Sequence, residues 1–440
     1  MNYMITTKKI NKPILIYVDS VSRDLLVATI LKNVLEEKHF KVFLVSRTTY
    51  KLLVKIIKPQ VYIVIKNFLK NFEEDLIPYL KKTDVLIIDA EGAMTEERCE
   101  YHFTHFGIKL DKTLDIIKRA YLWNENFSSF LKKKLNILNK NVSVMGSPKL
   151  SLAKYYSSPL SKLNVIGFVG RFSATNDFMQ RTALFTTLER KIKNDLYSDG
   201  AIGELNVLNV YLRIIDKLIK NTNLKISIRP HPNEKFDSWN ILKEKYGQRI
   251  DISGNEEDFL EWMKRVDKIV TTPSTSIIEP LILNKPVICV DKVTGGSGLN
   301  KYFEEMLDGF LDSTVRPDNE NELFEKIISD EIIIKKKTDS FYKSIKEYYN
   351  VTNISGNESI ENISLDLINE YAPSSLHNFL AIVYFIPFYF YNCFVWLKIY
   401  IRQKNEFFYH YNYMNDKFSS DRLITSKSVL ERVKNLKHDK

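Results

Sequence analysis

Short apolar runs, many of them β-branched, alternate with segments of helical period along most of this chain, and no other feature constrains its fold as strongly. Such alternation is typical of parallel α/β architecture. Between the first two runs, for example, Val27, Ile30 and Val34 recur at helical spacing. We predict a first series of strands at residues 14–19, 42–46, 61–65, 85–89, 120–123 and 142–145.

A second series repeats this plan beyond Gly146. Its predicted strands lie at residues 165–169, 225–228, 250–252, 268–270 and 287–291. A helix after the first of these strands is marked by apolar residues at steps of three and four, namely Leu205, Leu208, Leu212, Ile215 and Ile219.

Two such series predict two α/β domains with a cleft between them. We expect Rossmann-like domains at residues 1–150 and 160–348, followed by a hydrophobic, mainly helical C-terminal extension at 349–440. Since ligands of open α/β sheets bind beyond the carboxyl ends of the strands, the strand ends are the first place to look for a site.

The charge of the chain favours anionic partners. Its 440 residues include 64 Lys or Arg and 54 Asp or Glu, a net charge of +10, which suits nucleotides, phosphorylated lipids or an anionic membrane surface without choosing among them. The three cysteines are far apart and odd in number, so we expect a reducing compartment. The apolar stretch at residues 14–18 is too short for a signal peptide, which favours the cytoplasm.

Residues 379–397 contain no charge and are interrupted only by Pro387 and Asn392, so they are long enough to cross a membrane. Residues 398–440 carry ten Lys or Arg and five acids, which favours a cytoplasmic tail. One simple crossing would put that tail on the opposite side from the α/β domains. We therefore expect peripheral or monotopic attachment to the inner face of the membrane, through a helix lying in the interface or a shallow hairpin bent at Pro387. A buried C-terminal helix pair is the alternative.

The segment IRPHPNE, residues 228–234, ends a predicted strand and combines a fixed cation with an imidazole between two prolines. Arg229 could pair with a phosphate through two hydrogen bonds, and His231 could donate a hydrogen bond to the same group or supply a proton as it leaves. The alternative is a histidine at a strand end that only satisfies the backbone.

Hydroxyl side chains follow the next strand but one. Ser274, Thr275 and Ser276 precede a short predicted helix, where hydroxyls and backbone N–H groups favour an anion. Glu279 could accept hydrogen bonds from ribose hydroxyls. The alternative is an ordinary N-cap with an acid in the first turn. Arg171, after the first strand of the second series, is a further candidate to touch the donor.

In the first series Asp89 and Glu91 follow a strand, with Gly92 allowing the backbone to turn. In an extended segment both carboxylates point to one side and could take a proton from an attacking hydroxyl. An acidic turn that caps the next helix is the alternative. Cys99, His102 and His105 lack a fourth ligand at a known zinc spacing, so we expect no metal.

These motifs occur in the order DAEG, VMGSPKL, IRPHPNE and TTPSTSIIEPLILNKPVICVD, and from about residue 14 to residue 291 the chain resembles the bacterial surface carbohydrate biosynthesis proteins. That family is similar to GT-B glycosyltransferases, which implies a donor nucleotide held by the second domain, an acceptor held by the first, and catalysis without a metal. RPHP is also similar to a motif of the glycerophosphate polymerases of teichoic acid synthesis.

An acidic pair before glycine, then His-Pro, then a Ser/Thr pair resembles bacterial sialyltransferases and polysialyltransferases. Carried over, the pattern makes Glu91 the base, His231 the acid at the phosphate, and Ser274 with Thr275 the phosphate ligands. In that family two acids directly precede the glycine, whereas here Ala90 stands at the first position, so Glu91 or Asp89 must substitute or the chemistry must differ.

The resemblance implies a sugar transferase that uses a UDP- or CMP-linked donor and needs no other cofactor. The acceptor would be a hydroxyl of a surface polysaccharide or of its lipid-linked precursor, and no nucleic acid would take part. The alternatives are a UDP-sugar 2-epimerase, a glycerophosphotransferase that uses CDP-glycerol, and an inactive nucleotide-sugar-binding membrane scaffold.

Overall fold

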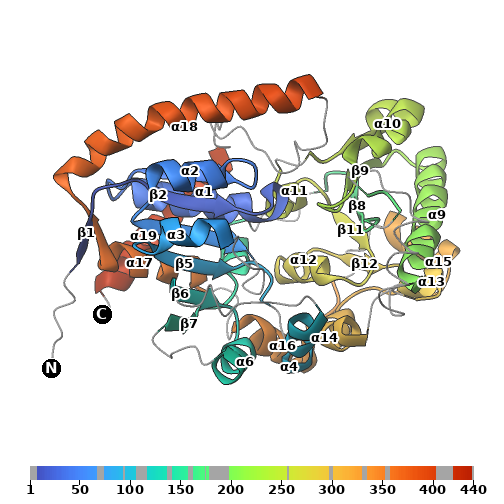
Figure 1. Ribbon diagram of the computed structural model, residues 1–440. Helices are drawn as coiled ribbons and strands as arrows, with labels where there is room; N and C mark the ends of the chain where they lie inside the picture. Colours follow the sequence, from blue (N-terminus) through green and yellow to red (C-terminus); the bar gives the residue numbers. More distant parts are fainter. Residues whose placement is uncertain are drawn as a thin grey trace. The chain divides into compact units, whose positions relative to one another are not determined.

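Two parallel β-sheets organise the chain, each in its own compact unit (Figure 1). Unit 1 comprises Met1–Tyr155 and Ile345–Lys440, and unit 2 comprises Tyr156–Ser344. The computed structural model describes residues 7–66, 74–92, 95–105, 116–135, 141–156, 162–173, 175–177, 198–254, 257–296, 301–329, 334–351, 357–402 and 420–438.

The sheet of unit 1 has the strand order β3-β2-β4-β5-β6-β7, and every neighbouring pair is parallel. Its strands are β2 (Ile14–Val18), β3 (Val42–Ser46), β4 (Val61–Lys66), β5 (Asp84–Asp89), β6 (Ile117–Leu122) and β7 (Val142–Val144). All residues of β2, β3 and β4 are buried, as expected for parallel strands covered on both faces. The strand order reverses between β2 and β4.

Helices of unit 1 follow these strands along the chain. They are α1 (Val21–Glu36), α2 (Tyr50–Ile57), α3 (Ile77–Leu80), α4 (Glu96–His105), α6 (Glu125–Leu135) and α7 (Pro148–Ala153). In α2, Tyr50, Leu53, Val54 and Ile57 are buried at helical spacing.

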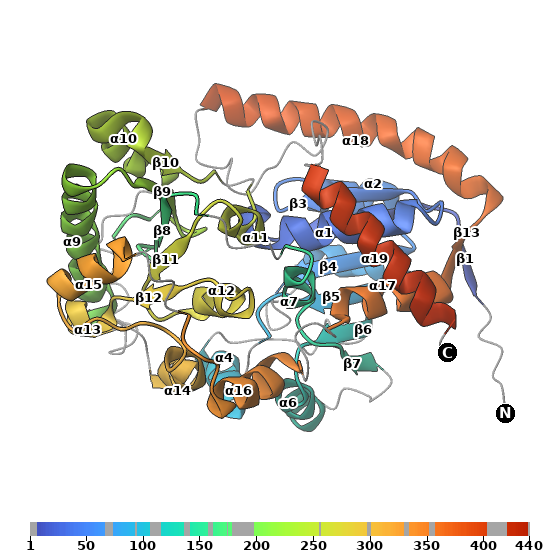
Figure 2. The ribbon, with the colours of Figure 1, turned by 180° about the vertical axis from the view of Figure 1, so that it is seen from behind.

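The C-terminal region completes unit 1. It contains the end of α16 (Asp339–Tyr349), then α17 (Ser359–Glu370), β13 (Tyr371–Pro373), α18 (Ser375–Arg402) and α19 (Ser420–His438). β13 pairs in parallel with β1 (Lys8–Ile10), and α19 packs against α1 and α17, which Figure 2 shows from behind.

The sheet of unit 2 has the order β10-β9-β8-β11-β12 and is also parallel throughout. Its strands are β8 (Val165–Val169), β9 (Lys225–Arg229), β10 (Ile250–Ile252), β11 (Lys268–Thr271) and β12 (Val287–Cys289). Its helices are α9 (Ser198–Asn221), α10 (Asn240–Tyr246), α11 (Phe259–Met263), α12 (Ile278–Ile282), α13 (Asp291–Thr294), α14 (Lys301–Leu311) and α15 (Glu320–Ile328).

The predicted α/β fold with two Rossmann-like sheets and a helical C-terminal region is confirmed. Each of the eleven predicted strands is present, with ends that differ by a few residues. In α9, however, Leu205 and Leu212 are exposed, and the stripe that packs on the sheet includes Val207, Tyr211 and Leu218 instead. The predicted Ile215 is buried in this stripe, and Leu208 and Ile219 pack against it. The Tyr211 hydroxyl donates to the carbonyl oxygens of Val169 and Val270 beneath the helix.

The structure corrects two expectations for residues 379–397. There is no hairpin at Pro387, because α18 continues through the proline as one gently curved helix (Figure 1). Nor is α18 buried: only 22% of its apolar window, Ser375–Val395, lies inside the structure, although the window is long and apolar enough to cross a membrane.

His377, in the first turn of α18, fixes the start of this helix. The side chain is fully buried, and its Nε2 accepts a hydrogen bond from the backbone N–H of Lys41 at 2.7 Å. Burial and the nearby charge of Lys41 lower the pKa of His377. Folding therefore favours the neutral ring, whose acceptor nitrogen the contact requires.

We expect unit 1 to lose stability as the pH falls below about 6.5, the usual histidine pKa, because the unfolded chain then binds a proton that the folded chain resists. His377→Gln keeps an acceptor without titrating in this range. The free energy of unfolding of the variant, measured by urea denaturation at pH 7.5 and pH 5.5, should fall less than that of the wild type. An equal fall in both proteins would contradict this role.

Candidate functional site

The carboxyl edge of the sheet in unit 2 gathers most of the predicted binding residues. β8 is the central strand, with β9 on one side and β11 on the other, so the strand order reverses between β8 and β11. Ligands of open parallel sheets bind at such a reversal. The ends of β9 and β11 are two strand spacings apart, about 10 Å.

Glu234, in the turn after β9, ties two strand ends together. Its Oε1 accepts hydrogen bonds from the backbone N–H groups of Phe172 at 3.0 Å and His231 at 2.8 Å, and its Oε2 accepts one from Nε1–H of Trp239 at 2.9 Å. Gly170 leaves the space for this carboxylate, because a Cβ there would lie 2.6 Å from Oε1. The loops after β8 and β9 are thus held in one arrangement.

Glu234 is buried, and that burial raises its pKa to about 7 although the hydrogen bonds it accepts act in the opposite direction. Its charge therefore changes near neutral pH, where an ordinary glutamate is fully ionised. The turn that carries His231 rests on this carboxylate.

The orientation of the His231 ring is fixed within the turn itself. Its Nδ1 accepts a hydrogen bond from the backbone N–H of Asn233 at 3.1 Å, and the backbone N–H of Glu234 donates to the His231 carbonyl at 2.8 Å. With Nδ1 as an acceptor, the neutral ring carries its proton on Nε2. The half-buried ring is thus arranged as a hydrogen-bond donor.

Arg229, the last residue of β9, is buried and has partners in the protein. Its Nη1 donates to the Ser253 hydroxyl at 2.5 Å and to the Gly254 carbonyl at 3.0 Å, both beyond the end of β10. Burial lowers the pKa of the guanidinium, and nearby acids offset this only in part. In this arrangement Arg229 positions the ends of β9 and β10, and direct contact with a phosphate stays a prediction.

The predicted hydroxyl turn follows β11. Ser274 caps the short helix at Thr275–Ile277: its hydroxyl accepts a hydrogen bond from the Ser276 N–H at 3.3 Å and lies 2.5 Å from the Ser276 hydroxyl. Thr275 is exposed, and Glu279 is half-buried in the first turn of α12.

Arg171 connects the central strand to this turn. It follows β8, and its Nη1 donates to the Pro273 carbonyl at 3.4 Å. The structure therefore brings Arg171 next to the Ser274 turn on one side, while Phe172 is bound through Glu234 to the His231 turn on the other. A guanidinium, hydroxyls and an imidazole along one edge could bind a phosphate group.

The acids of unit 1 lie at the carboxyl edge of the other sheet. Glu91 pairs with Nη1 of Arg23, and Arg23 also bonds to Asp24 at 2.7 Å and lies 3.7 Å from Asp19. Burial alone would lower the pKa of Arg23, but Asp24 and Glu91 raise it above the usual value. Arg23 is therefore a fixed cation among three carboxylates, and Glu91 is its half-buried partner.

Asp89 is buried at the end of β5, in a tightly held loop. Nε1–H of Trp123 donates to the Asp89 carbonyl at 2.7 Å, and Nδ2–H of Asn124 donates to the Gly92 carbonyl at 2.9 Å. A Cβ at Gly92 would collide with Oδ2 of Asp89 and with Trp123. The loop after β5 therefore requires glycine at this position for space, and the role of Asp89 in catalysis stays a prediction.

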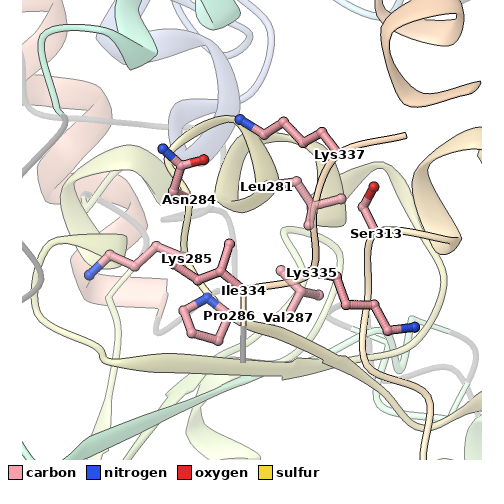
Figure 3. Close-up of a pocket in the computed structure, with 9 residues that line it drawn as sticks. All are labelled: Leu281, Asn284, Lys285, Pro286, Val287, Ser313, Ile334, Lys335 and Lys337. Atoms are coloured by element: carbon pink, nitrogen blue, oxygen red, sulfur yellow. The ribbon is translucent and has the colours of Figure 1, made fainter. Parts of the chain in front are cut away.

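A small pocket lies at the opposite, amino end of β12 (Figure 3). Lys285, Lys335 and Lys337 contribute to its wall, but Figure 3 shows their nitrogen ends pointing away from one another. Lys285 bonds to the Val266 carbonyl at 2.8 Å, so it caps the chain after α11. These lysines do not converge on one anion.

Within the described ranges, no group of three or more His, Cys, Asp or Glu side chains is arranged to hold a metal ion. The side chains of His102 and His105, which entered the weak zinc pattern, lie outside the described residues.

Sequence reasoning missed Arg23 and the bridging role of Glu234. Glu234 belongs to the IRPHPNE motif, so the sequence could have marked it as a candidate residue. Its hydrogen bond from the Phe172 N–H could not be predicted from the sequence. Arg23 had no motif, and its only signal was a basic residue just after the first strand.

Comparisons with known proteins find similarity in structure but not in sequence. No protein-family model matches the sequence, and no curated protein matches it significantly. Among solved structures, S. aureus MnaA with UDP is 15% identical, with 82% of this chain and 99% of that chain covered and a TM-score of 0.46.

Two further solved structures are similar at the same level. The UDP-GlcNAc 2-epimerase of Methanocaldococcus jannaschii, in complex with UDP-GlcNAc and UDP, is 15% identical over 81% of this chain and 99% of that chain, with a TM-score of 0.45. The wall teichoic acid polymerase TagF is 12% identical over 83% and 90%, with a TM-score of 0.49. Identities this low carry neither a ligand nor an activity over to this chain.

Glu234→Gln should change how stability depends on pH. Since the folded chain holds the Glu234 proton up to about pH 7 and the unfolded chain releases it near pH 4.5, the wild type loses stability on the order of 3 kcal/mol through this window. The variant lacks that loss. Urea denaturation at pH 4.5 and pH 7.5 gives the free energy of unfolding of both proteins. The value for the variant minus that for the wild type should be larger at pH 7.5 than at pH 4.5, and an equal difference at both pH values would contradict the raised pKa.

Gly92→Ala should destabilise unit 1 by about 1–3 kcal/mol, because the new methyl group overpacks the loop against Asp89 and Trp123. Gly254→Ala is a matched control in unit 2, since a Cβ there has nothing within 4 Å. Urea denaturation midpoints of both variants measure the loss of stability. Equal midpoints would mean that the loop after β5 accommodates the methyl group, which contradicts the prediction.

Proposed function

We propose that the protein is a glycosyltransferase that moves a sugar from a UDP- or CMP-linked donor to a hydroxyl of a surface polysaccharide or its lipid-linked precursor. The observation that carries the proposal is the arrangement at the carboxyl edge of unit 2. There the His231 ring is held as a hydrogen-bond donor after β9. Arg171, after β8, lies beside the Ser274 turn, after β11, and the strand order reverses between β8 and β11.

In this proposal unit 2 binds the donor phosphate. Arg171 supplies a fixed positive charge, while Ser274, Thr275 and Ser276 supply hydroxyl donors. His231 donates its Nε2 proton in a hydrogen bond to the departing phosphate oxygen. Such donors are effective because they are already oriented where negative charge develops. Glu279 is the proposed partner of the ribose hydroxyls.

Glu91 of unit 1 is the proposed general base, with Asp89 as its neighbour on the same loop. The acceptor oxygen forms a bond to the anomeric carbon of the sugar, its proton passes to Glu91, and the bond from that carbon to the phosphate oxygen breaks with its electron pair going to the nucleotide. Arg23 would hold the Glu91 carboxylate in place and in its charged form.

Donor binding can be tested by thermal stabilisation with UDP, CMP, CDP and GDP compounds. A ligand at 100 times its dissociation constant adds about 2.7 kcal/mol of stability. We expect one nucleotide class to stabilise the wild type, and His231→Ala and Ser274→Ala to lose most of that effect. Asn223→Ala is the control, because Asn223 is exposed in the same unit and precedes β9, at the opposite, amino edge of the sheet. Full stabilisation of His231→Ala would remove its phosphate role.

Transfer is tested with Glu91→Gln. A positioned general base contributes about 10²- to 10⁴-fold, so kcat should fall by such a factor while donor stabilisation stays unchanged. Glu125→Gln, at an exposed glutamate of the same unit, should leave kcat unchanged. If Arg23→Gln lowers stability as much as Glu91→Gln and neither lowers kcat, the pair is structural only.

Assays of nucleotide binding and turnover also distinguish the alternative functions. Interconversion of a UDP-sugar without an acceptor would identify a 2-epimerase, and consumption of CDP-glycerol would identify a glycerophosphotransferase. Donor binding without turnover in either wild type or Glu91→Gln would identify a scaffold.

A further inference from the structure

Helix α18 has two apolar sides, and only one of them is used inside unit 1. The inner stripe includes Ala381, Phe388, Asn392 and Val395, all buried. Phe388 belongs to the core cluster of unit 1 and stacks on Phe43 of β3, with ring centroids 4.7 Å apart. The half-buried Tyr384 and Tyr391 pack against the same cluster.

Hydrogen bonds to the backbone of unit 1 also hold the start of α18. His377 accepts its hydrogen bond from the backbone N–H of Lys41 at 2.7 Å. The N–H of Ser374, just before α18, donates to the Ile10 carbonyl of β1 at 2.9 Å. A membrane crossing would have to break these contacts and expose the Phe43 ring.

The outward side of α18 is a continuous apolar surface, which we call the outer face. It consists of Leu376, Phe379, Ile382, Val383, Phe385, Ile386, Tyr389, Phe390, Phe394 and Leu397, each 41–68% exposed. No residue from Ser375 to Leu397 carries an Asp, Glu, Lys or Arg side chain. The span Ser375–Val395 is about 31 Å long at helical rise. Contiguous exposed apolar surfaces of this size mark sites of interaction with another protein or a membrane.

A group of lysines lies at the amino end of the outer face. Lys12 follows β1 by two residues, and its Nζ donates to the Lys58 carbonyl at 3.0 Å, while Lys41 contacts His377 through its backbone. Lys41 and Lys58 are exposed and Lys12 is half-buried. These lysines lie near the start of α18, so unit 1 carries an apolar surface with positive charges at one end of it.

We propose that the outer face of α18 lies flat in one leaflet of a bilayer that contains anionic lipids, with Lys12, Lys41 and Lys58 at the headgroups. An amphipathic or apolar helix on the surface of a bilayer combines these two attractions, burial of apolar side chains and contact of lysines with anionic lipids. A soluble partner would be expected to meet a polar rim, whereas the exposed polar side chains that the described part of α18 adds beside the outer face, Ser375 and Asn378, are uncharged and lie at its amino end. The proposal is independent of the transfer chemistry, because it needs no donor and no residue of unit 2.

Vesicle sedimentation tests the surface. We expect the full chain to bind vesicles of phosphatidylglycerol and phosphatidylcholine, and binding to fall at least tenfold in the triple variant Phe379→Ser, Ile386→Ser, Phe390→Ser. Ile241→Ser is the matched control, because Ile241 is 66% exposed in unit 2, close to the 67% of Phe390. An unchanged melting temperature of the triple variant would show that it folds, as expected for exposed positions.

The lysines are tested with Lys12→Gln, Lys41→Gln and Lys58→Gln. Each should weaken binding to anionic vesicles about fivefold at low salt and leave binding to pure phosphatidylcholine unchanged. Unaltered binding of the triple serine variant overturns the proposal. So does a lipid-free dimer that dissociates in that variant, since the outer face would then bind a second copy. Transfer to a soluble acceptor in a chain that ignores vesicles would overturn only this proposal and leave the proposed function standing.

The flat orientation is tested by spin labels in a Cys393→Ser background, where the remaining Cys99 and Cys289 are fully buried. A nitroxide at Phe390→Cys should become accessible to oxygen and shielded from a water-soluble nickel reagent when vesicles are added. A nitroxide at Tyr384→Cys, on the inner flank, should change little. Membrane burial of both labels would mean that α18 leaves unit 1 and spans the bilayer, which contradicts the proposal.

Discussion

Parallel pairing of strands decides where everything else in this protein can lie. A parallel strand needs a crossover to reach its neighbour, so each sheet is covered by helices and every strand ends at the same edge. In unit 2 that edge collects the turns after β8, β9 and β11. Residues as distant in sequence as Arg171 and Pro273 are in contact there because of the strand order, not because of any local signal.

The two carboxyl edges have opposite character. In unit 2 the edge carries an imidazole donor, hydroxyls and Arg171, with Glu234 buried beneath the turns as their support. In unit 1 the edge carries Asp19, Asp24 and Glu91 around one guanidinium. Hydrogen-bond donors are thus gathered at the edge of one unit and carboxylates at the edge of the other, and the proposed transfer assigns a role to each.

The sequence was sufficient to predict the features that depend on residues close together in the chain. β-Branched runs identified the strands because most of their residues are buried, and His231 and Ser274 could be placed because each closely follows such a run. What could not be predicted depends on partners far along the chain. The link from Glu234 to Phe172 spans 62 residues and that from Arg23 to Glu91 spans 68, and no periodicity encodes either of them. β1 was missed for the same reason, because Lys8–Ile10 has no strand pattern and pairs with a segment near residue 372.

The pairing of β1 with β13 also governs the order in which the protein can be built. Chains leave the ribosome from the N-terminus, and domains generally fold as units. Unit 2 is one continuous stretch, Tyr156–Ser344, and is fully synthesised before α17, β13, α18 and α19 exist. The N-terminal sheet must therefore wait through the synthesis of the whole of unit 2 before β1 finds its partner and α1 is covered by α19. During that interval nascent unit 1 carries uncovered apolar surface, the condition under which partly folded chains aggregate.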